Sequence, residues 1–148
     1  MAEFLRAVAG SFIACFAFCF ILNVRGRLLA AAPIGAVLCW LTYLAAGRFL
    51  GDFSCYFIAT VAVSIYGEVM ARVCRAPVTV FLLVGLLPLV PGGGIYYTME
   101  YALQRDTTAF LNQLLTTFGI AGCLALGVLV VSSATRFFSI LHYHKKVF

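Results

Sequence analysis

Long apolar runs, separated only by short connections that carry charge, are the feature that most limits what this chain can fold into. Of the 148 residues, 64% are hydrophobic and only 10% are charged, and the mean hydropathy is +1.08. A water-soluble domain needs far more polar surface than this. Lipid is therefore the main solvent. We predict an all-α integral membrane protein, because helices satisfy their own backbone hydrogen bonds in a bilayer.

Five of these runs are long enough to cross a bilayer, which takes about 20 residues of helix. We predict five transmembrane helices in a single transmembrane domain over residues 1–148. The spans cover residues about 4–22, 28–47, 53–71, 77–104 and 107–135, and a short basic tail follows at 136–148. The first run resembles the apolar part of a signal peptide. Its poor basic leader and the lack of a small-residue cleavage pattern favour a span of the mature protein.

Basic residues are unevenly divided between the two sides of the predicted membrane domain. One side, formed by the connections after the first and third spans and by the C-terminal tail, carries seven of them: Arg25, Arg27, Arg72, Arg75, Arg136, Lys145 and Lys146. The other side carries three: Arg6, Arg48 and Arg105. Cytoplasmic connections are enriched in Lys and Arg, so we expect the N-terminus outside and the C-terminus in the cytoplasm.

Several classes of function are disfavoured by the same composition. The net charge is +5, but the basic residues occur singly or in pairs, and nucleic acid needs a clustered basic face. The six cysteines form no CxxC pair, and neither they nor His142 and His144 show zinc spacing, so we expect no metal and no cofactor. We expect no enzyme either, because no intramembrane His, Cys or Ser lies near a plausible base and orienting acid.

The segment LVPGGGIYYTM interrupts the fourth predicted span. A straight helix of about 28 residues would reach about 42 Å, well beyond a hydrocarbon core of about 30 Å. Pro88 and Pro91 each remove a backbone donor, and the glycines of residues 92–94 weaken a helix further. The break lies roughly 20 Å along the helix from Pro77. We therefore predict an interruption in the membrane interior, with the helix resuming near Ile95.

A broken helix inside a bilayer predicts a ligand site. Its unwound backbone survives only against protein or a watery cavity, and the resumed helix presents free N–H groups that favour an anion. The substrate carboxylate is predicted to lie on the backbone of Pro91, Gly92, Gly93 and Gly94, with the hydroxyls of Tyr96, Tyr97 and Thr98 orienting it. The alternative is a structural kink that packs against a neighbouring helix.

Two acidic residues within the spans are candidates for proton coupling. Glu100 lies about two turns beyond the glycines, and an acid in a span is by default a functional candidate; alternatively it pairs with Gln104 or Arg105 at the interface. Glu68 precedes Arg72 by four residues, which suits a structural ion pair on one helix face. Both the coupling and the structural alternatives remain open.

Polar and small residues mark the remaining faces. Asn112 is assigned to the substrate site because it opens the fifth span together with Gln113, Thr116 and Thr117; these side chains could instead bond to neighbouring helices. Small residues that recur every four positions predict close helix contacts: Gly119, Cys123 and Gly127, and also Gly35 and Cys39.

Taken together, these segments resemble the small five-span half of the threonine/serine exporter family. The resemblance is carried by LNVRGRLL, APIGAVLCWLTYL, YGEVMARVCRAPVTVF and LLPLVPGGGIYYTM, whose order covers nearly the whole chain. It implies export of an amino acid or small dicarboxylate, driven by an ion gradient, across the plasma membrane of a prokaryote. It also implies a heteromeric complex with a larger five-span subunit of opposite topology, which the fused members of the family carry in one chain.

We therefore expect an oligomeric, multi-pass subunit of a proton-coupled antiporter that exports small carboxylate-bearing metabolites. Threonine and serine are the first candidates, and a dicarboxylate such as succinate is another. The competing hypothesis is a non-transporting assembly or scaffold subunit, whose glycines only permit tight packing.

Overall fold

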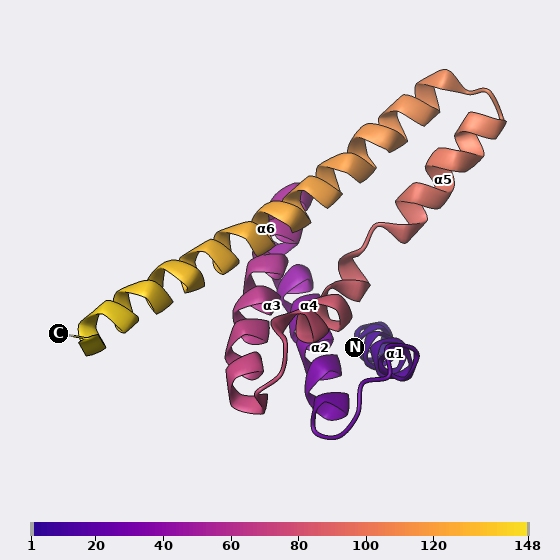
Figure 1. The fold of residues 1–148 in the computed structure, drawn as a ribbon. Coiled ribbons are helices and arrows are strands. Elements are labelled where there is room, and N and C mark those ends of the chain that lie inside the picture. Colours follow the sequence, from indigo (N-terminus) through magenta and orange to yellow (C-terminus); the bar gives the residue numbers. More distant parts are fainter. Residues whose placement is uncertain (1, 148) are drawn as a thin grey trace.

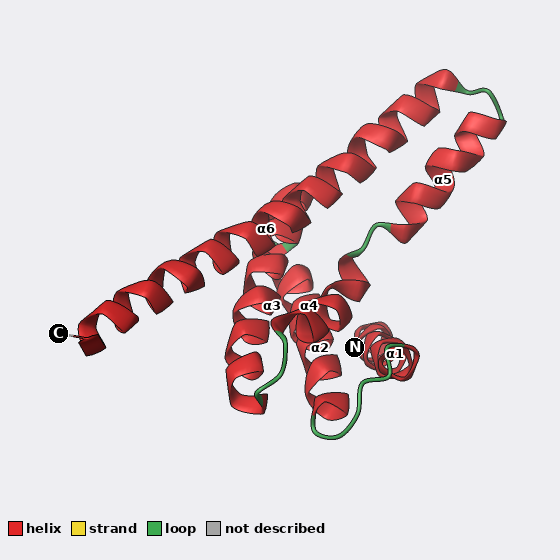
Figure 2. Cartoon of the chain, viewed as in Figure 1, coloured by secondary structure: helices red, strands yellow, loops and turns green. Residues whose placement is uncertain are grey.

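The chain is entirely helical over the part that the structure describes. The computed structural model describes the backbone of residues 2–147 and the side chains of residue 6 and residues 8–137, and no strand occurs in that backbone. The elements are α1 (Ala2–Ile21), α2 (Leu28–Ala46), α3 (Asp52–Cys74), α4 (Val78–Leu86), the 3₁₀ helix η1 (Leu87–Leu89), α5 (Gly92–Leu103) and α6 (Thr107–Val147) (Figures 1 and 2). The all-α prediction is confirmed.

The helices form a bundle from which one helical hairpin projects. α1 to α4 gather at one end of the molecule, and α5 and α6 run side by side away from it (Figure 1). α6 then returns across the bundle and packs on α3, while α5 packs mainly against α6. The helix break therefore lies where the chain leaves the bundle.

Left-handed residues end three of the helices. Asn23, Arg75 and Arg105 have φ values of 54°, 51° and 58°, and each follows the last turn of α1, α3 or α5. This conformation lets the chain turn sharply while it satisfies the last carbonyl groups of a helix. At the start of α6, the carboxylate of Asp106 accepts a hydrogen bond from the Ala109 N–H (3.0 Å), which caps that helix.

Small residues hold α2, α3 and α4 together. A Cβ atom on Gly35 would lie 2.8 Å from the Tyr66 ring, and one on Gly85 would lie 2.5 Å from the Val63 Cγ2. The Tyr66 hydroxyl donates a hydrogen bond to the carbonyl of Ala31 (2.7 Å). Close backbone approach of this kind is how helices associate where lipid provides no hydrophobic driving force.

The contacts of α3 with α6 show that the two helices run parallel. A Cβ on Gly119 would lie 2.6 Å from the ring of Phe53, and a Cβ on Gly127 would lie 2.7 Å from Cγ2 of Thr60. The residue numbers rise together along both helices. The predicted close contacts are thus confirmed at Gly119 and Gly127, as they are at Gly35, and Cys39 is fully buried beside α3.

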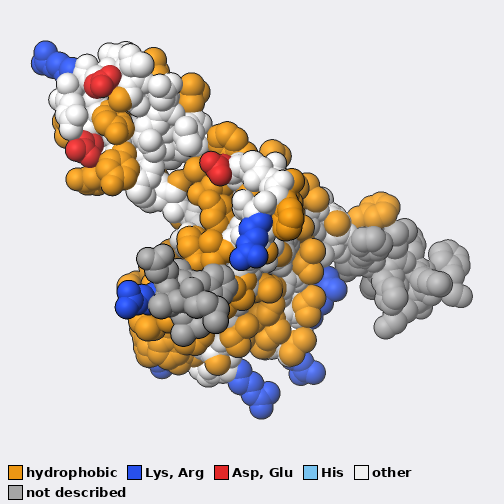
Figure 3. Space-filling view, turned by 180° about the vertical axis from the view of Figure 1, so that it is seen from behind, with side chains coloured by type: hydrophobic (Ala, Val, Ile, Leu, Met, Phe, Trp, Pro, Cys, Tyr) orange, Lys and Arg blue, Asp and Glu red, His pale blue; other side chains and the backbone are white. Residues whose placement is uncertain are grey.

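The surface and the helix lengths suit a membrane. Hydrophobic side chains cover much of the bundle in Figure 3. Among the described residues, three helices are long and apolar enough to span: Leu28–Ala46, Asp52–Cys74 and Thr107–Phe137. α4, η1 and α5 add a fourth candidate as a pair bent by 55°, and the described apolar part of α1, Val8–Ile21, is shorter. This count reaches four, so the fifth span stays a prediction.

Two details differ from the sequence-based expectation. The helix resumes at Gly92 rather than near Ile95, so the glycines form the first turn of α5 instead of an unwound strip. The N–H groups of a first turn have no partner within their own helix. Here the Gly92 N–H donates to the Val90 carbonyl before the helix, and Pro91 has no N–H to donate. α6 also continues beyond the predicted end of the fifth span, so the backbone of residues 136–147 is helical.

Candidate functional site

The break between η1 and α5 is two residues long. The N–H of Val90 still reaches back to the carbonyls of Leu86 (3.2 Å) and Leu87 (3.3 Å). Pro91 has no N–H, and the N–H of Gly92 turns sharply to the carbonyl of Val90 (2.7 Å). The helical hydrogen-bond pattern ends there, and the axis of α5 is inclined by 55° to that of α4 and η1. The predicted helix break at Pro91 is confirmed, and its place within a fourth membrane span stays a prediction.

The three glycines of the break have different surroundings. Gly92 and Gly93 are exposed, and nothing lies within 4 Å of where their Cβ atoms would be. The backbone of this turn is therefore open to a ligand, and its N–H groups stand at the positive end of the α5 dipole. A Cβ on Gly94, in contrast, would lie 2.6 Å from Thr117 Oγ1. Gly94 thus serves the packing of α5 on α6.

The predicted orienting hydroxyls lie on two different faces. Tyr96 and Tyr97 are 65% and 51% exposed, and their rings meet edge to face at 5.5 Å. Thr98 is buried, and its hydroxyl donates a hydrogen bond to the carbonyl of Gly94 (2.7 Å). The two tyrosines remain accessible beside the open glycines, whereas the proton of Thr98 is already engaged within α5.

A cavity of about 460 Å³ lies between α5 and α6, beside the break. Its lining is almost wholly apolar, and the two threonine hydroxyls in it already bond to backbone carbonyls. Its lining residues are Val90, Pro91, Ile95, Thr98, Met99, Leu114, Thr117, Phe118, Ala121 and Leu124. Pro91 is the link between this cavity and the glycine turn. A carboxylate would find no free donor inside the cavity. The Gly92 N–H is engaged with the Val90 carbonyl, so the first-turn N–H of the open Gly93 is the better anion donor.

Of the polar residues at the start of α6, some face α5 and others are exposed. Gln113 and Thr117 approach the α5 backbone at Gly94. Asn112, which the sequence assigned to the substrate site, is exposed. Its backbone carbonyl accepts a hydrogen bond from the Thr116 hydroxyl (2.9 Å). Gln113 and Thr117 were recognised in the sequence only as part of a polar stretch. Their four-residue spacing places both on one face of α6.

The two acidic candidates lie in separate parts of the molecule. Glu100 lies in α5 and accepts a hydrogen bond from Gln104 Nε2 (3.1 Å), one turn later. Glu68 lies in α3, where its carboxylate is 3.7 Å from the Arg72 guanidinium. The structural pairings foreseen from the sequence, Glu100 with Gln104 and Glu68 with Arg72, are therefore both present.

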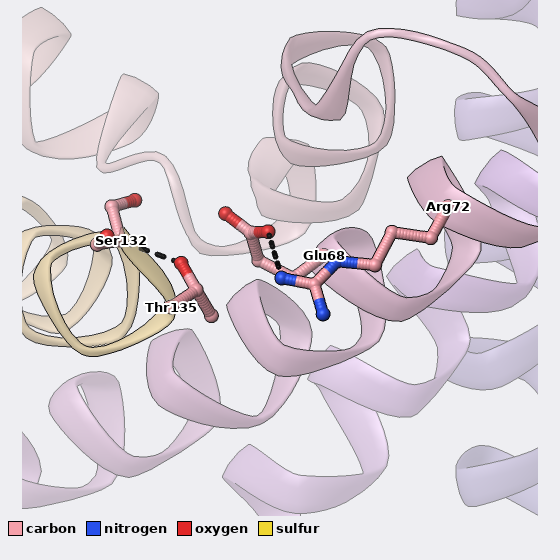
Figure 4. A network of polar contacts seen from close by, with 4 residues as sticks. All are labelled: Glu68, Arg72, Ser132 and Thr135. Atoms are coloured by element: carbon pink, nitrogen blue, oxygen red, sulfur yellow. Dashed lines mark hydrogen bonds and ion pairs between the residues drawn. The ribbon is translucent and has the colours of Figure 1, made fainter. Parts of the chain in front are cut away.

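Glu68 also faces a second helix. Its side chain is only 18% exposed, whereas that of Arg72 is 67% exposed. Figure 4 shows the carboxylate of Glu68 between Arg72 and the turn of α6 that carries Ser132 and Thr135. The acid is thus directed into the contact between α3 and α6, and the base reaches outward.

Comparison with known proteins places this architecture in a transporter family. The family model described as "Threonine/Serine exporter, ThrE" matches residues 7–134, which is most of the chain and includes the helix break. No curated protein and no solved structure matches the chain in the corresponding comparisons. The match confirms the resemblance drawn from the sequence and is consistent with a membrane transporter rather than an enzyme. The chain therefore belongs to the threonine/serine exporter family.

Proposed function

We propose that this chain is a subunit of a secondary exporter for small carboxylate-bearing metabolites, with threonine and serine as the first candidates. One observation carries the proposal: the first turn of α5 offers open backbone at Gly92 and Gly93 directly after a break in an apolar helix pair. Transporters commonly hold a substrate carboxylate at such a half-helix N-terminus near the middle of the bilayer.

The parallel course of α3 and α6 supports a five-span topology. After α3, the chain must return to the side where α3 began before α6 can run in the same direction. The bent pair of α4 and α5 does this if it crosses the membrane. A re-entrant loop would start α6 on the side where α3 ends, and the two helices would be antiparallel. With α1 as the remaining span, the N-terminus lies outside and the C-terminus in the cytoplasm of a prokaryotic cell.

A partner subunit would complete the site. Gly92, Gly93, Tyr96 and Tyr97 are exposed on the single chain, and unpaired backbone amides at membrane depth must face protein or a watery cavity. α5 packs mainly against α6, which leaves its other side uncovered. A larger five-span subunit of opposite topology would cover this side and place the substrate between two inverted halves, as in many transporters.

An efflux assay on the two-subunit complex in lipid vesicles tests the proposal. Gly93→Val puts a branched side chain over the open turn, while Gly122→Val is a matched control in α6, where nothing lies within 4 Å of a Cβ either. A hydrogen bond to a charged group contributes about 1.5–3 kcal/mol. Loss of one bond should therefore lower export about tenfold or more for Gly93→Val, with little change for Gly122→Val.

The same assay addresses proton coupling. Export driven by an imposed proton gradient should fall when Glu100→Gln or Glu68→Gln removes the coupling acid, while exchange of substrate across equal pH persists. If neither Gly93→Val nor Glu100→Gln changes export, the site assigned to the helix break is wrong.

The Gly94–Thr117 contact favours one alternative, a scaffold subunit whose glycines only permit close packing. The two functions differ in what Gly93→Val changes. In a scaffold, the substitution lowers the yield of the assembled complex and leaves the apparent affinity for substrate intact. In an exporter subunit, the complex assembles and the affinity falls.

A further inference from the structure

A row of polar residues lies inside the contact between α3 and α6. Thr60, Ser64 and Glu68 follow one another at four-residue intervals, so they share one face of α3. Thr60 touches α6 at Gly127. Because the helices are parallel, Ser64 and Glu68 fall level with Val131 and Thr135, and Figure 4 shows Glu68 directed at that turn. We call this row, together with Ser132 and Thr135, the α3–α6 seam.

Ser64 is the least expected member of the seam. It is 1% exposed, and its hydroxyl has no hydrogen-bond partner among the described residues. A buried hydroxyl without a partner costs free energy, and one in lipid is a candidate for function. Side chains four residues apart on a helix have Cβ atoms about 5–6 Å apart. The Glu68 carboxyl is therefore the nearest titratable group on that face.

Thr135 supplies a hydroxyl that faces Glu68 across the α3–α6 seam (Figure 4). Its hydroxyl donates its one proton to the carbonyl of Ser132 (3.1 Å), which leaves only lone pairs for other contacts. A carboxylate can only accept hydrogen bonds, whereas a carboxylic acid can also donate one. With its proton on the Ser132 carbonyl, Thr135 can accept a hydrogen bond from protonated Glu68. With its hydroxyl turned toward α3, it can donate one to the ionised carboxylate.

We propose that Glu68 is a proton-binding carboxyl of this protein, and that Ser64 and Thr135 are its positioning residues in the α3–α6 seam. On uptake, the Glu68 carboxylate takes a proton from water and becomes a carboxylic acid; on release, the proton returns to water and the pairing with Arg72 is restored. Of the helices packed on α3, α6 carries one charged residue within its described side chains, the exposed Arg136, and neither α2 nor α4 carries any. Only the use of this proton to drive export rests on the proposed function.

Infrared difference spectroscopy of the purified full chain in lipid bilayers tests the inference without any substrate. Between alkaline and acidic buffer, all five acidic side chains can contribute to the carbonyl band of a protonated carboxylic acid. One component of this band, called the Glu68 component, should be absent in Glu68→Gln and present in Glu100→Gln. Ser64→Ala and Thr135→Val, which nearly preserve side-chain volume, should each shift the Glu68 component. Ser133→Ala, an exposed neighbour on α6, is the matched control and should leave it in place.

Two results overturn the proposal: a carbonyl band that Glu68→Gln leaves unchanged, or a Glu68 component that neither Ser64→Ala nor Thr135→Val moves. The comparison of Ser64→Ala with Thr135→Val can be made even if Glu68→Gln does not fold, because these two substitutions are conservative. Failure of the exporter function is recognised separately. In that case the band behaves as described, and vesicles show no export that depends on a proton gradient.

Discussion

Gly94 of α5 lies against Thr117 of α6 so closely that a Cβ atom on the glycine would be 2.6 Å from the threonine Oγ1. The Thr117 hydroxyl donates to the carbonyl of Gln113 (2.7 Å), which fixes its rotamer. The third glycine of the triplet is therefore a packing residue, and it keeps the broken helix against its neighbour.

We expect Gly94→Ala to destabilise the protein relative to Gly122→Ala. Both changes add one methyl group to a helix, but only the first forces atoms together, at a cost of about 1–3 kcal/mol. Thermal unfolding in detergent measures the difference. Thr117→Ala removes the clashing atom, so the double variant should recover most of the loss. Equal stability of the two alanine variants would show that the helices separate at no cost.

The crossing of the bent pair predicts where two loops lie. In a background without the six natural cysteines, Arg75→Cys and Arg105→Cys should react with membrane-impermeant reagents from opposite sides, the first from the cytoplasm and the second from outside. Arg48→Cys should behave like Arg105→Cys. Labelling of positions 75 and 105 from the same side would mean that α4 and α5 form a re-entrant loop.

Gly85 and Val63 should be energetically coupled. The Val63 Cγ2 lies 2.5 Å from where a Cβ on Gly85 would be, and a valine in a helix has one preferred rotamer, so Gly85→Ala should cost about 1–3 kcal/mol. Val63→Ala makes room for the new methyl group. A double-mutant cycle of unfolding free energies should give a coupling of about 0.5–3 kcal/mol. Additive losses would contradict the close contact of α3 and α4.

The left-handed end of α3 offers a test that involves no packing. Arg75 has φ 51°, and its N–H bonds to the carbonyl of Ala71. This conformation costs a residue with a Cβ roughly 1 kcal/mol or more, which glycine avoids. Arg75→Gly and Arg75→Ala lose the same charge, so the glycine variant should be more stable than the alanine variant by about 1 kcal/mol. At Arg48, where φ is not positive, the order should reverse or vanish.

The sequence predicted the helices well because apolar runs and charged connections follow directly from the bilayer. The break was found at Pro91, because proline lacks a donor wherever it stands. The conformation of residues 92–94 was not foreseen, since glycine propensity describes a helix interior. In a first turn, N–H groups need no backward partner, so three glycines can be helical there.

Which helices surround the candidate residues could not be predicted from the sequence, because helix neighbours are set by tertiary packing. Four-residue spacing indicated that Gly119 and Gly127 face another helix, but not that this helix is α3 or that it runs parallel. Ser64 was therefore not predicted as a site residue from its place in an apolar span, although it lies level with Val131 across the seam. Glu68 and Arg72 were predictable as a pair because both lie on one helix.

The polar row on α3 has a consequence for biogenesis. Translation proceeds from the N-terminus, so α3 enters the bilayer before the ribosome has made α6. Until then, Thr60 has no Gly127 beside it and Glu68 has no Thr135 (Figure 4). We therefore expect the insertion machinery or another polypeptide to cover this polar face of α3 until α6 takes its place.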